Sequence, residues 1–242
     1  MSYIDQFNFT IIFIQNLFLN IYRKICMQNI FITGGTGYIG IRLIKLLLKE
    51  GFHITALVRK GSEKKLPEGC NLVVANPFNE GTFQNAIKPG SIFIQLLGVP
   101  HPSPSKKELF RQIDLASVVA SAQAAKYANA THFIYISVAQ TPTNIMKDYQ
   151  ACRASGEAEI VKTNIPYSFI RPWYVVGPGH YWPLLFLPVL KTLELFPLTS
   201  KKAKALRLVY IDQILRTLLH ATKNPPVNGI KIYEIEEIRR TR

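Results

Sequence analysis

The stretch that most constrains the fold of this 242-residue chain is NIFITGGTGYIGIRLIKLLLKEG, which runs from Asn29 to Gly51. Its first five residues, 29–33, are mostly apolar and predict a buried strand. From Tyr38 to Glu50 apolar residues recur at helical spacing, and Gly51 is suited to end that helix. Three glycines in GxxGxxG spacing separate the two elements: Gly34, Gly37 and Gly40.

Each glycine has a physical role in a strand-to-helix turn of this kind. The first allows a tight turn after the strand, the second lets a pyrophosphate approach the backbone, and the third lets helix and strand pack closely. Free N–H groups and the helix dipole then favour an anion at the helix N-terminus. A helix cap without a ligand is the alternative, but this strand-loop-helix setting favours a dinucleotide site. The cofactor-binding residues predicted here are Gly34, Thr36, Gly37, Tyr38, Ile39 and Gly40.

The end of the second predicted strand indicates which dinucleotide is bound. NAD-binding proteins commonly place a carboxylate there for the ribose 2′-hydroxyl, whereas an arginine suits a 2′-phosphate. This chain has LVRKGS, with Arg59 followed by Lys60. The sequence therefore predicts NADP, with NAD open because Arg59 could instead be a solvated loop residue that stacks on adenine.

Strands and helices alternate along most of the chain. This pattern predicts a doubly wound α/β Rossmann fold with a parallel sheet covered on both faces and a small C-terminal cap. Ser105 and Glu108 form a capping-box pattern at the start of one predicted helix. The predicted strands span 52–59, 71–76, 91–98 and 132–139, with a sixth inside 167–177, and the predicted helices span 82–87, 105–129 and 147–163.

The alternation loosens after Gly179. We expect residues 27–179 to form the dinucleotide-binding Rossmann domain and 180–242 a small substrate or cap region that completes it. LRLVYIDQILRTLLHATKN predicts a strand and a helix, which Asp212 would cap, and GIKIYEI predicts a final strand.

Residues 1–26 are apolar and aromatic, but Gln15, Asn16 and Asn20 interrupt them before they reach the length of a membrane span. Their positive charges follow the apolar stretch, unlike those of a signal peptide. We therefore expect this extension to lie outside the fold, with Met27 close to its start. Contact of residues 7–25 with a membrane surface is the alternative interpretation.

Charge and cysteine content narrow the function further. The net charge is +14, and the last 42 residues hold ten Lys or Arg against four Asp or Glu. Nucleic acid or an anionic membrane could attract this charge, but the basic residues form no helical stripe, and EEIRRTR is expected to be a frayed basic tail. We expect no nucleic-acid partner. Three cysteines and five histidines show no metal-ligand spacing, so we expect no metal and a reducing, cytoplasmic setting.

Three further segments resemble the short-chain dehydrogenase/reductase superfamily in its extended and atypical branches: FIYISVAQ, YQACR and IPYSFIRPWYVVGPG. TGGTGYIG is similar to the glycine loop of those branches. Residues 28–179 resemble the NAD-dependent epimerase/dehydratase and NAD(P)H-binding, NmrA-like groups well, and the rest of the chain resembles them loosely. The resemblance implies an oxidoreductase or epimerase-like protein that acts on a small carbonyl or hydroxyl substrate of unknown identity. It also implies that the chain could form a homo-oligomer.

The resemblance assigns roles to residues beyond the glycine loop. An adenine contact falls at Asn76, where the family carries Asp, and the loop after the fourth strand places Leu97 and Gly98 against the cofactor ribose. Pro172 would face the nicotinamide. The implied catalytic residues are Ser137, Tyr149 and Arg153.

Arg153 stands where the family's YxxxK motif has lysine. The i, i+4 spacing places Tyr149 and Arg153 on one helix face, where a positive charge would favour phenolate and could bind a ribose hydroxyl. A guanidinium does not readily lose a proton, so it cannot join a lysine-type relay. Three outcomes stay open: a working reductase or dehydrogenase that uses Tyr149, a redox sensor or scaffold that binds the dinucleotide and a protein partner, and another enzymatic role.

Two other groups are candidates for the substrate side. His101, between two prolines, is either a proton donor over the cofactor or a residue that stiffens its loop. Aromatic and histidine residues follow the sixth strand, where they either wall a substrate pocket or pack under a cap: Trp173, Tyr174, His180, Tyr181 and Trp182.

Overall fold

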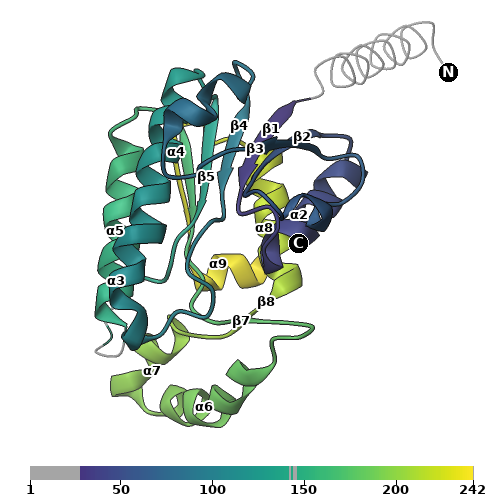
Figure 1. The fold of residues 1–242 in the computed structure, drawn as a ribbon. Helices are drawn as coiled ribbons and strands as arrows, with labels where there is room; N and C mark the ends of the chain where they lie inside the picture. Colours follow the sequence, from purple (N-terminus) through teal and green to yellow (C-terminus); the bar gives the residue numbers. More distant parts are fainter. Residues whose placement is uncertain (1–27, 142, 144–145, 242) are drawn as a thin grey trace, which may run out of the picture.

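A seven-stranded parallel sheet forms the centre of the computed structural model, which describes residues 28–141, 143 and 146–241. The strand order is β3-β2-β1-β4-β5-β6-β9, so the chain moves outward from β1 in one direction and then in the other. This is the predicted doubly wound Rossmann arrangement (Figure 1). The strands are β1 (Asn29–Thr33), β2 (His53–Val58), β3 (Asn71–Val74), β4 (Ile92–Gln95), β5 (His132–Ile136), β6 (Tyr167–Ile170) and β9 (Ile230–Tyr233).

Helices cover both faces of the sheet. Figure 1 shows α4 (Ala116–Tyr127) and α5 (Lys147–Val161) along one face, with α2 (Tyr38–Lys49) and α8 (Ile211–Lys223) on the other. The strands supply both layers, because neighbouring side chains of β1 point to opposite faces: Ile30 and Ile32 pack with the α2–α8 layer, and Phe31 packs with the α4–α5 layer. The near-continuous apolar strands are explained by this two-sided burial.

The chain between β4 and β5 is less regular than the single helix predicted over 105–129. Residues Pro104–Lys106 form a 3-10 turn, α3 spans Lys107–Leu109, and Phe110–Leu115 form a π-helical segment before α4. The predicted capping box at Ser105 is wrong, because Ser105 lies inside the 3-10 turn and its hydroxyl is 2.9 Å from that of Ser103. The helix predicted over 82–87 is likewise replaced by two 3-10 turns, Glu80–Thr82 and Gln84–Ala86.

Two predictions for the C-terminal region are also wrong. EEIRRTR is not a frayed tail, because α9 (Ile235–Arg240) follows β9 and buries Ile235 and Ile238 in the core. Asp212 does not cap α8: it lies in the first turn, after Tyr210 at the N-cap position. The side chain of Gln213 accepts the Tyr210 N–H at 2.8 Å instead. The predicted strand and helix themselves are present as β8 (Val209–Tyr210) and α8.

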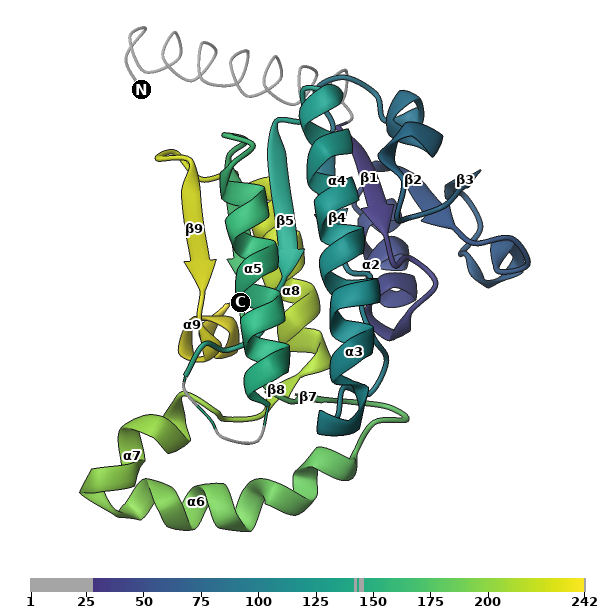
Figure 2. The ribbon, with the colours of Figure 1, turned by 60° about the vertical axis from the view of Figure 1, so that its left-hand side comes forward.

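Between β6 and α8 the chain leaves the sheet. It forms β7 (Val175–Val176), a 3-10 turn over Trp182–Phe186, α6 (Leu187–Leu195) and α7 (Pro197–Lys204), and β8 pairs with β7. Figure 2 shows α6 and α7 beyond the carboxyl ends of the strands. Within the described ranges no helix is long and apolar enough to cross a bilayer. The extension 1–26, including residues 7–25, lies outside the described residues.

His132, at the start of β5, gives the fold a measurable pH dependence. Its ring is fully buried and Nε2 lies 2.9 Å from the Ser168 hydroxyl, and burial lowers the pKa of the imidazole to about 4. Between about pH 6.5 and 4 the unfolded chain binds a proton that the folded chain does not, so stability falls as the pH falls through this window. Relative to His132→Gln, the wild type should lose about 2 kcal/mol between pH 7.5 and 5.

Urea unfolding of both proteins at each pH measures this difference. The comparison at pH 7.5 is the reference, because there the imidazole is neutral in the folded and unfolded states. A stability difference that stays constant down to pH 5 would show that His132 binds a proton equally well in both states.

Candidate functional site

A cavity of about 540 Å³ opens at the carboxyl ends of the strands. It lies beside β1 and β4, the neighbouring strands from which the chain runs in opposite directions across the sheet. In open α/β sheets this reversal leaves a crevice because the loops after the two strands diverge. The position of the cavity therefore follows from the strand order.

The glycine loop forms one wall of this cavity. Gly34 adopts a φ of +72°, and a Cβ there would lie 2.6 Å from the Leu96 carbonyl carbon at the end of β4. A Cβ on Gly40 would lie 2.3 Å from the Gly34 oxygen, so α2 could not sit this close to β1 with any other residue. The first and third glycines thus have the predicted turn and packing geometry.

Gly37 differs from the other two glycines. It is exposed, its φ of −81° suits any residue, and it occupies the N-cap of α2 without a capping side chain. The first turn of α2 contains no acidic residue. The N–H groups at this helix end therefore face the cavity side without a competing carboxylate, as phosphate binding requires.

The cavity brings together most of the predicted site residues. Those on its wall are Gly34, Gly37, Tyr38, Ile39, Gly40, Gly98, Ser137, Tyr149, Arg153 and Pro172. Four predicted cofactor contacts are not among the lining residues: Thr36, Arg59, Asn76 and Leu97. All of these assignments remain predictions about the bound state.

Arg59 and Asn76 lie farther along the same edge of the sheet. Leu57 pairs with Thr33 in the β1–β2 register, so Arg59 follows where the glycine loop begins, and its side chain is exposed. The Asn76 side chain accepts the Phe78 N–H at 3.0 Å and so closes a local turn. This bond leaves the Asn76 amide nitrogen as the group available to adenine.

Ser137 and Tyr149 share the cavity although they come from different elements. Ser137 directly follows β5, and its hydroxyl is buried without a hydrogen-bond partner among the described residues. Tyr149 lies in the first turn of α5, half-buried, with its ring 5.0 Å from that of Phe110. Burial raises the pKa of the Tyr149 phenol. The phenol is therefore protonated at neutral pH.

Arg153 does not act as a free positive charge beside Tyr149. Its Nη2 lies 2.6 Å from Asp114 Oδ1, and both side chains are almost completely buried. Its Nη1 donates to the Tyr135 hydroxyl at 3.2 Å and to the Ile136 carbonyl at 3.1 Å. The Arg153 charge does lower the Tyr149 pKa, as expected, but burial raises that pKa by more and the Asp114 charge also opposes the arginine.

Asp114 is the site residue that sequence reasoning missed. It is fully buried in the π-helical segment ahead of α4, and its Oδ2 accepts the Val99 N–H at 3.0 Å. The signal in the sequence was its place on a buried helical stripe, since it shares the spacing of the buried residues Phe110, Ser117, Val118 and Ser121. An acid on such a stripe requires a buried partner.

The Arg153–Asp114 ion pair also restricts which residue can stand at position 98, in the loop after β4. A Cβ on Gly98 would lie 2.3 Å from Arg153 Nη2 and 3.0 Å from Asp114 Oδ1, so this position has room for glycine alone. The Gln95 amide donates to the Ser117 hydroxyl at 3.0 Å, and that hydroxyl donates to the Asp114 carbonyl at 3.0 Å. Asp114, Arg153 and this hydrogen-bond chain therefore hold one side of the cavity rigid.

Aromatic rings form the opposite wall. His101 adopts a φ of 49° and stacks on His180 at 5.3 Å, and the Trp182 indole donates to His180 Nε2 at 3.1 Å. That bond leaves the proton of the neutral imidazole on Nδ1. Burial lowers the pKa of His180, and the neighbouring His101 adds to the effect. Tyr174 and Trp173 also line the cavity, so four of the five predicted aromatic and histidine residues contribute to it; Tyr181 does not.

A family model described as NAD(P)H-binding matches residues 34–177, which include the glycine loop and the Ser137–Tyr149 wall. The chain belongs to this NAD(P)H-binding family. Its fold is also that of a UDP-glucuronic acid 4-epimerase from Bacillus cereus in complex with NAD: the TM-score is 0.62 at 17% identity, over 86% of this chain and 77% of the epimerase. The predicted Rossmann fold and the NAD(P)H cofactor class are thereby confirmed.

Two curated proteins are similar to this NAD(P)H-binding protein in sequence. Ceramide reductase of Caulobacter vibrioides (strain NA1000 / CB15N) is 22% identical over 212 residues, which are 86% of this chain and 64% of the reductase. Photosystem II assembly factor Ycf39 of Trieres chinensis is 22% identical over 146 residues, which are 60% of this chain and 45% of the factor. The chain thus spans less than two thirds of the length of either relative.

The buried Arg153–Asp114 pair predicts a large and asymmetric mutational effect. Arg153→Met leaves the Asp114 carboxylate buried without its cation and should cost about 3–5 kcal/mol at pH 7. Burial raises the pKa of Asp114 while Arg153 lowers it, so without the arginine the folded variant should retain a proton that the unfolded chain releases, and the cost should grow as the pH rises. Urea unfolding of the variant at pH 5 and 7 measures both effects.

The matched control is the double variant Arg153→Met/Asp114→Leu, which removes both charges. It should recover most of the lost stability, because apolar residues of similar size can replace a buried ion pair. A loss below about 1 kcal/mol in Arg153→Met would contradict the assignment, since it would equal that of an exposed pair.

Proposed function

We propose that this protein is an NADP(H)-dependent reductase for an uncharged carbonyl substrate. The observation that carries this proposal is that Ser137 and Tyr149, a hydroxyl pair from two different elements, face the same cavity as the glycine loop. Proton donation and cofactor binding then occur at one place. If Tyr149 served only to pack α5, there would be no reason for the Ser137 hydroxyl to lie beside the same cavity without a hydrogen-bond partner among the described residues.

The residues present fit the cofactor. The α2 N-terminus, with Gly37 at its N-cap, would hold the pyrophosphate, and Gly98 and Pro172 would border the ribose and nicotinamide end. When bound, the nicotinamide would supply hydride to the substrate carbon. The loop can keep this shape only with glycine at Gly34 and Gly40, because a Cβ at either position would meet the backbone of Leu96 or of Gly34.

The chain's own residues supply the proton and the orientation. Tyr149, kept neutral by its raised pKa, would donate its phenolic proton to the carbonyl oxygen. The Ser137 hydroxyl, which has no partner among the described residues, would donate a hydrogen bond to the same oxygen. Arg153 would act as a positioning residue for the Tyr149 ring, 5.2 Å away. A neutral phenol suits reduction better than oxidation, because oxidation requires a base.

The preference for NADP(H) rests on Arg59 and Lys60. Both are exposed where β2 ends, next to the glycine loop in the β1–β2 register. A guanidinium there would bind the 2′-phosphate with charge-assisted hydrogen bonds.

The substrate end of the cavity favours an apolar molecule. Its lining includes Val99, Met146, Trp173, Tyr174 and Trp182, and its one cation, Arg153, is neutralised by Asp114. A charged sugar nucleotide would find few partners there. An apolar carbonyl compound fits this wall, in keeping with the name of the similar ceramide reductase.

A second candidate function is dinucleotide binding without turnover, as a redox sensor or scaffold for a protein partner. The observation in its favour is the use of Arg153 within the protein core, which leaves the lysine position of YxxxK without a free cation. Similarity to an assembly factor is in keeping with this alternative.

Cofactor binding is tested at Gly37, whose φ suits any residue but where a Cβ would lie 3.2 Å from the Gly34 oxygen. Gly37→Asp should abolish NADPH and NADH binding, because the carboxylate would cap α2 and repel the phosphate, and Gly37→Ala is the matched control for the tight contact alone. Arg59→Gln should weaken NADPH binding roughly tenfold to a hundredfold and leave NADH unchanged. Fluorescence titration measures both dissociation constants. Undiminished NADPH binding in Gly37→Asp would place the phosphate elsewhere.

Turnover is tested at Tyr149 with a panel of apolar aldehydes and ketones. Tyr149→Phe should lower kcat at least a hundredfold without changing the dissociation constant for NADPH, because only the proton donor is removed. The matched control is Tyr127→Phe, an exposed tyrosine on α4, which should keep full activity. Equal rates for Tyr149→Phe and wild type would exclude Tyr149 as the donor. Tight NADPH binding with no turnover of any substrate would favour the sensor or scaffold.

A further inference from the structure

Large apolar side chains are exposed along one continuous segment, residues 181–204, which we call the arm. They come from the 3-10 turn, from α6 and from the residue that joins α6 to α7. Elsewhere in the described residues the longest such run is shorter and consists of Leu72, Val74 and Phe78. An exposed apolar run of this length marks an interaction surface on most proteins. The exposed members are Tyr181, Trp182, Leu185, Phe186, Leu193, Leu195 and Phe196.

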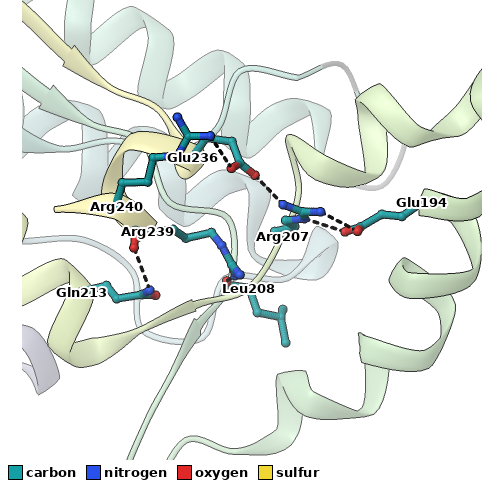
Figure 3. Close-up of polar contacts among 7 residues, drawn as sticks. All are labelled: Glu194, Arg207, Leu208, Gln213, Glu236, Arg239 and Arg240. Carbon is teal, nitrogen blue, oxygen red and sulfur yellow. Dashed lines mark hydrogen bonds and ion pairs between the residues drawn. The ribbon is translucent and has the colours of Figure 1, made fainter.

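The polar side of the arm is bound to the rest of the domain by ion pairs. Glu194 is bound by Arg207 through two hydrogen bonds, of 2.7 and 2.6 Å, and Arg207 also contacts Glu236 of α9 at 2.8 Å. Figure 3 shows Arg207 between the two carboxylates. Leu185 and Leu195, in contrast, are 81% and 80% exposed. The ion pairs therefore fix which side of α6 faces the domain and leave the apolar side outward.

The charge of the arm is positive. Residues 181–204 contain four lysines and one acid, Glu194, whose charge Arg207 compensates. Lys191, Lys201 and Lys204 are exposed, and no acid among the described residues lies within ion-pair distance of them. Lys201 and Lys204 line a hollow that also contains Glu234 and Glu236, whereas Lys191 lies on α6 one turn before Leu195. An apolar helix face with aromatic rings and a net positive charge is typical of a helix that lies in the interface of an anionic bilayer. Each such lysine contributes about 1 kcal/mol there.

The apolar surface continues into the cavity. Tyr174 stacks on Phe186 with ring centroids 5.5 Å apart and meets Trp182 edge-on at 5.3 Å. Tyr174 and Trp182 also line the cavity, whereas Phe186 belongs to the arm. The arm lies beyond the carboxyl ends of the strands, where the cavity opens (Figure 2). A molecule could therefore pass from the arm to the cavity along apolar side chains.

From these observations we infer that the arm docks on the surface of an anionic lipid bilayer and brings the mouth of the cavity to the membrane. Apart from Trp182, which also lines the cavity, the arm takes no part in the proposed reduction, so the inference holds whether or not the protein turns over a substrate. A bilayer fits both properties of the arm, since its headgroups match the lysines and its acyl region matches the leucines and aromatic rings.

The test uses the full chain and vesicles of phosphatidylcholine with and without 30% phosphatidylglycerol, a mixture chosen as roughly the anionic share of many membranes. Wild-type protein should sediment with the anionic vesicles and at least tenfold less with the neutral ones, and 0.5 M NaCl should weaken binding. Leu185→Ser/Leu195→Ser should reduce the partition coefficient at least tenfold, because two exposed leucines are lost. Val227→Ser, a fully exposed residue outside the arm, is the matched control and should bind like the wild type.

Two further measurements, of thermal stability and of NADPH affinity, show whether the leucine variants are otherwise intact. The leucine variants should keep their thermal stability and NADPH affinity, because neither residue lines the cavity or belongs to the core. Equal vesicle binding by the double variant and wild type would overturn the inference and point to residues 7–25 instead. Absence of binding to anionic vesicles would overturn it as well, as would a dimer that the two substitutions dissociate. If the wild-type protein binds anionic vesicles but not NADPH, the proposed function fails and the inference about the arm stands.

Discussion

The buried contact between Arg153 and Asp114 is the interaction on which the arrangement of the site depends. It joins α5 to the π-helical segment before α4, and through the Val99 N–H it also fixes the loop after β4. Each charge would be costly to bury alone, so the three segments cannot move apart without leaving one of them unpaired. The planar fork of arginine explains the residue choice, because it reaches Asp114, Tyr135 and the Ile136 carbonyl together, which a lysine could not do.

This pairing also determines the electrostatics of the cavity. In a site with a free lysine, the cation would stabilise a phenolate and support proton removal from an alcohol. Here the carboxylate balances the guanidinium, and the cavity holds a neutral phenol, a neutral imidazole and apolar rings. A charged group that entered this cavity would find no free counter-charge among the described residues that line it. Arginine at the lysine position therefore acts together with Asp114, which balances its charge.

The sequence was sufficient for the parts of the fold that depend on local pattern. The strands β1, β4 and β5 are buried on both faces and stand out as apolar runs, and the glycine spacing specifies the turn into α2. The sequence did not predict the features that depend on tertiary contacts. The π-helical segment carries Asp114, whose partner Arg153 comes much later in the chain, and α9 buries Ile235 and Ile238 in the core. Neither partner can be recognised from the segment itself, although the buried stripe through Asp114 was a usable sign.

The short pairing of β7 with β8 has a consequence for how such a protein can diversify. Val175 pairs with Val209, so the ends of the excursion that holds α6 and α7 are held together at its base. The entropic cost of closing a loop grows only slowly with its length, by about 0.6 kcal/mol for each doubling. Residues between these two strands can therefore be lengthened, shortened or exchanged with little effect on the sheet. Selection can rebuild the surface that meets the substrate while the glycine loop and its helix stay as they are.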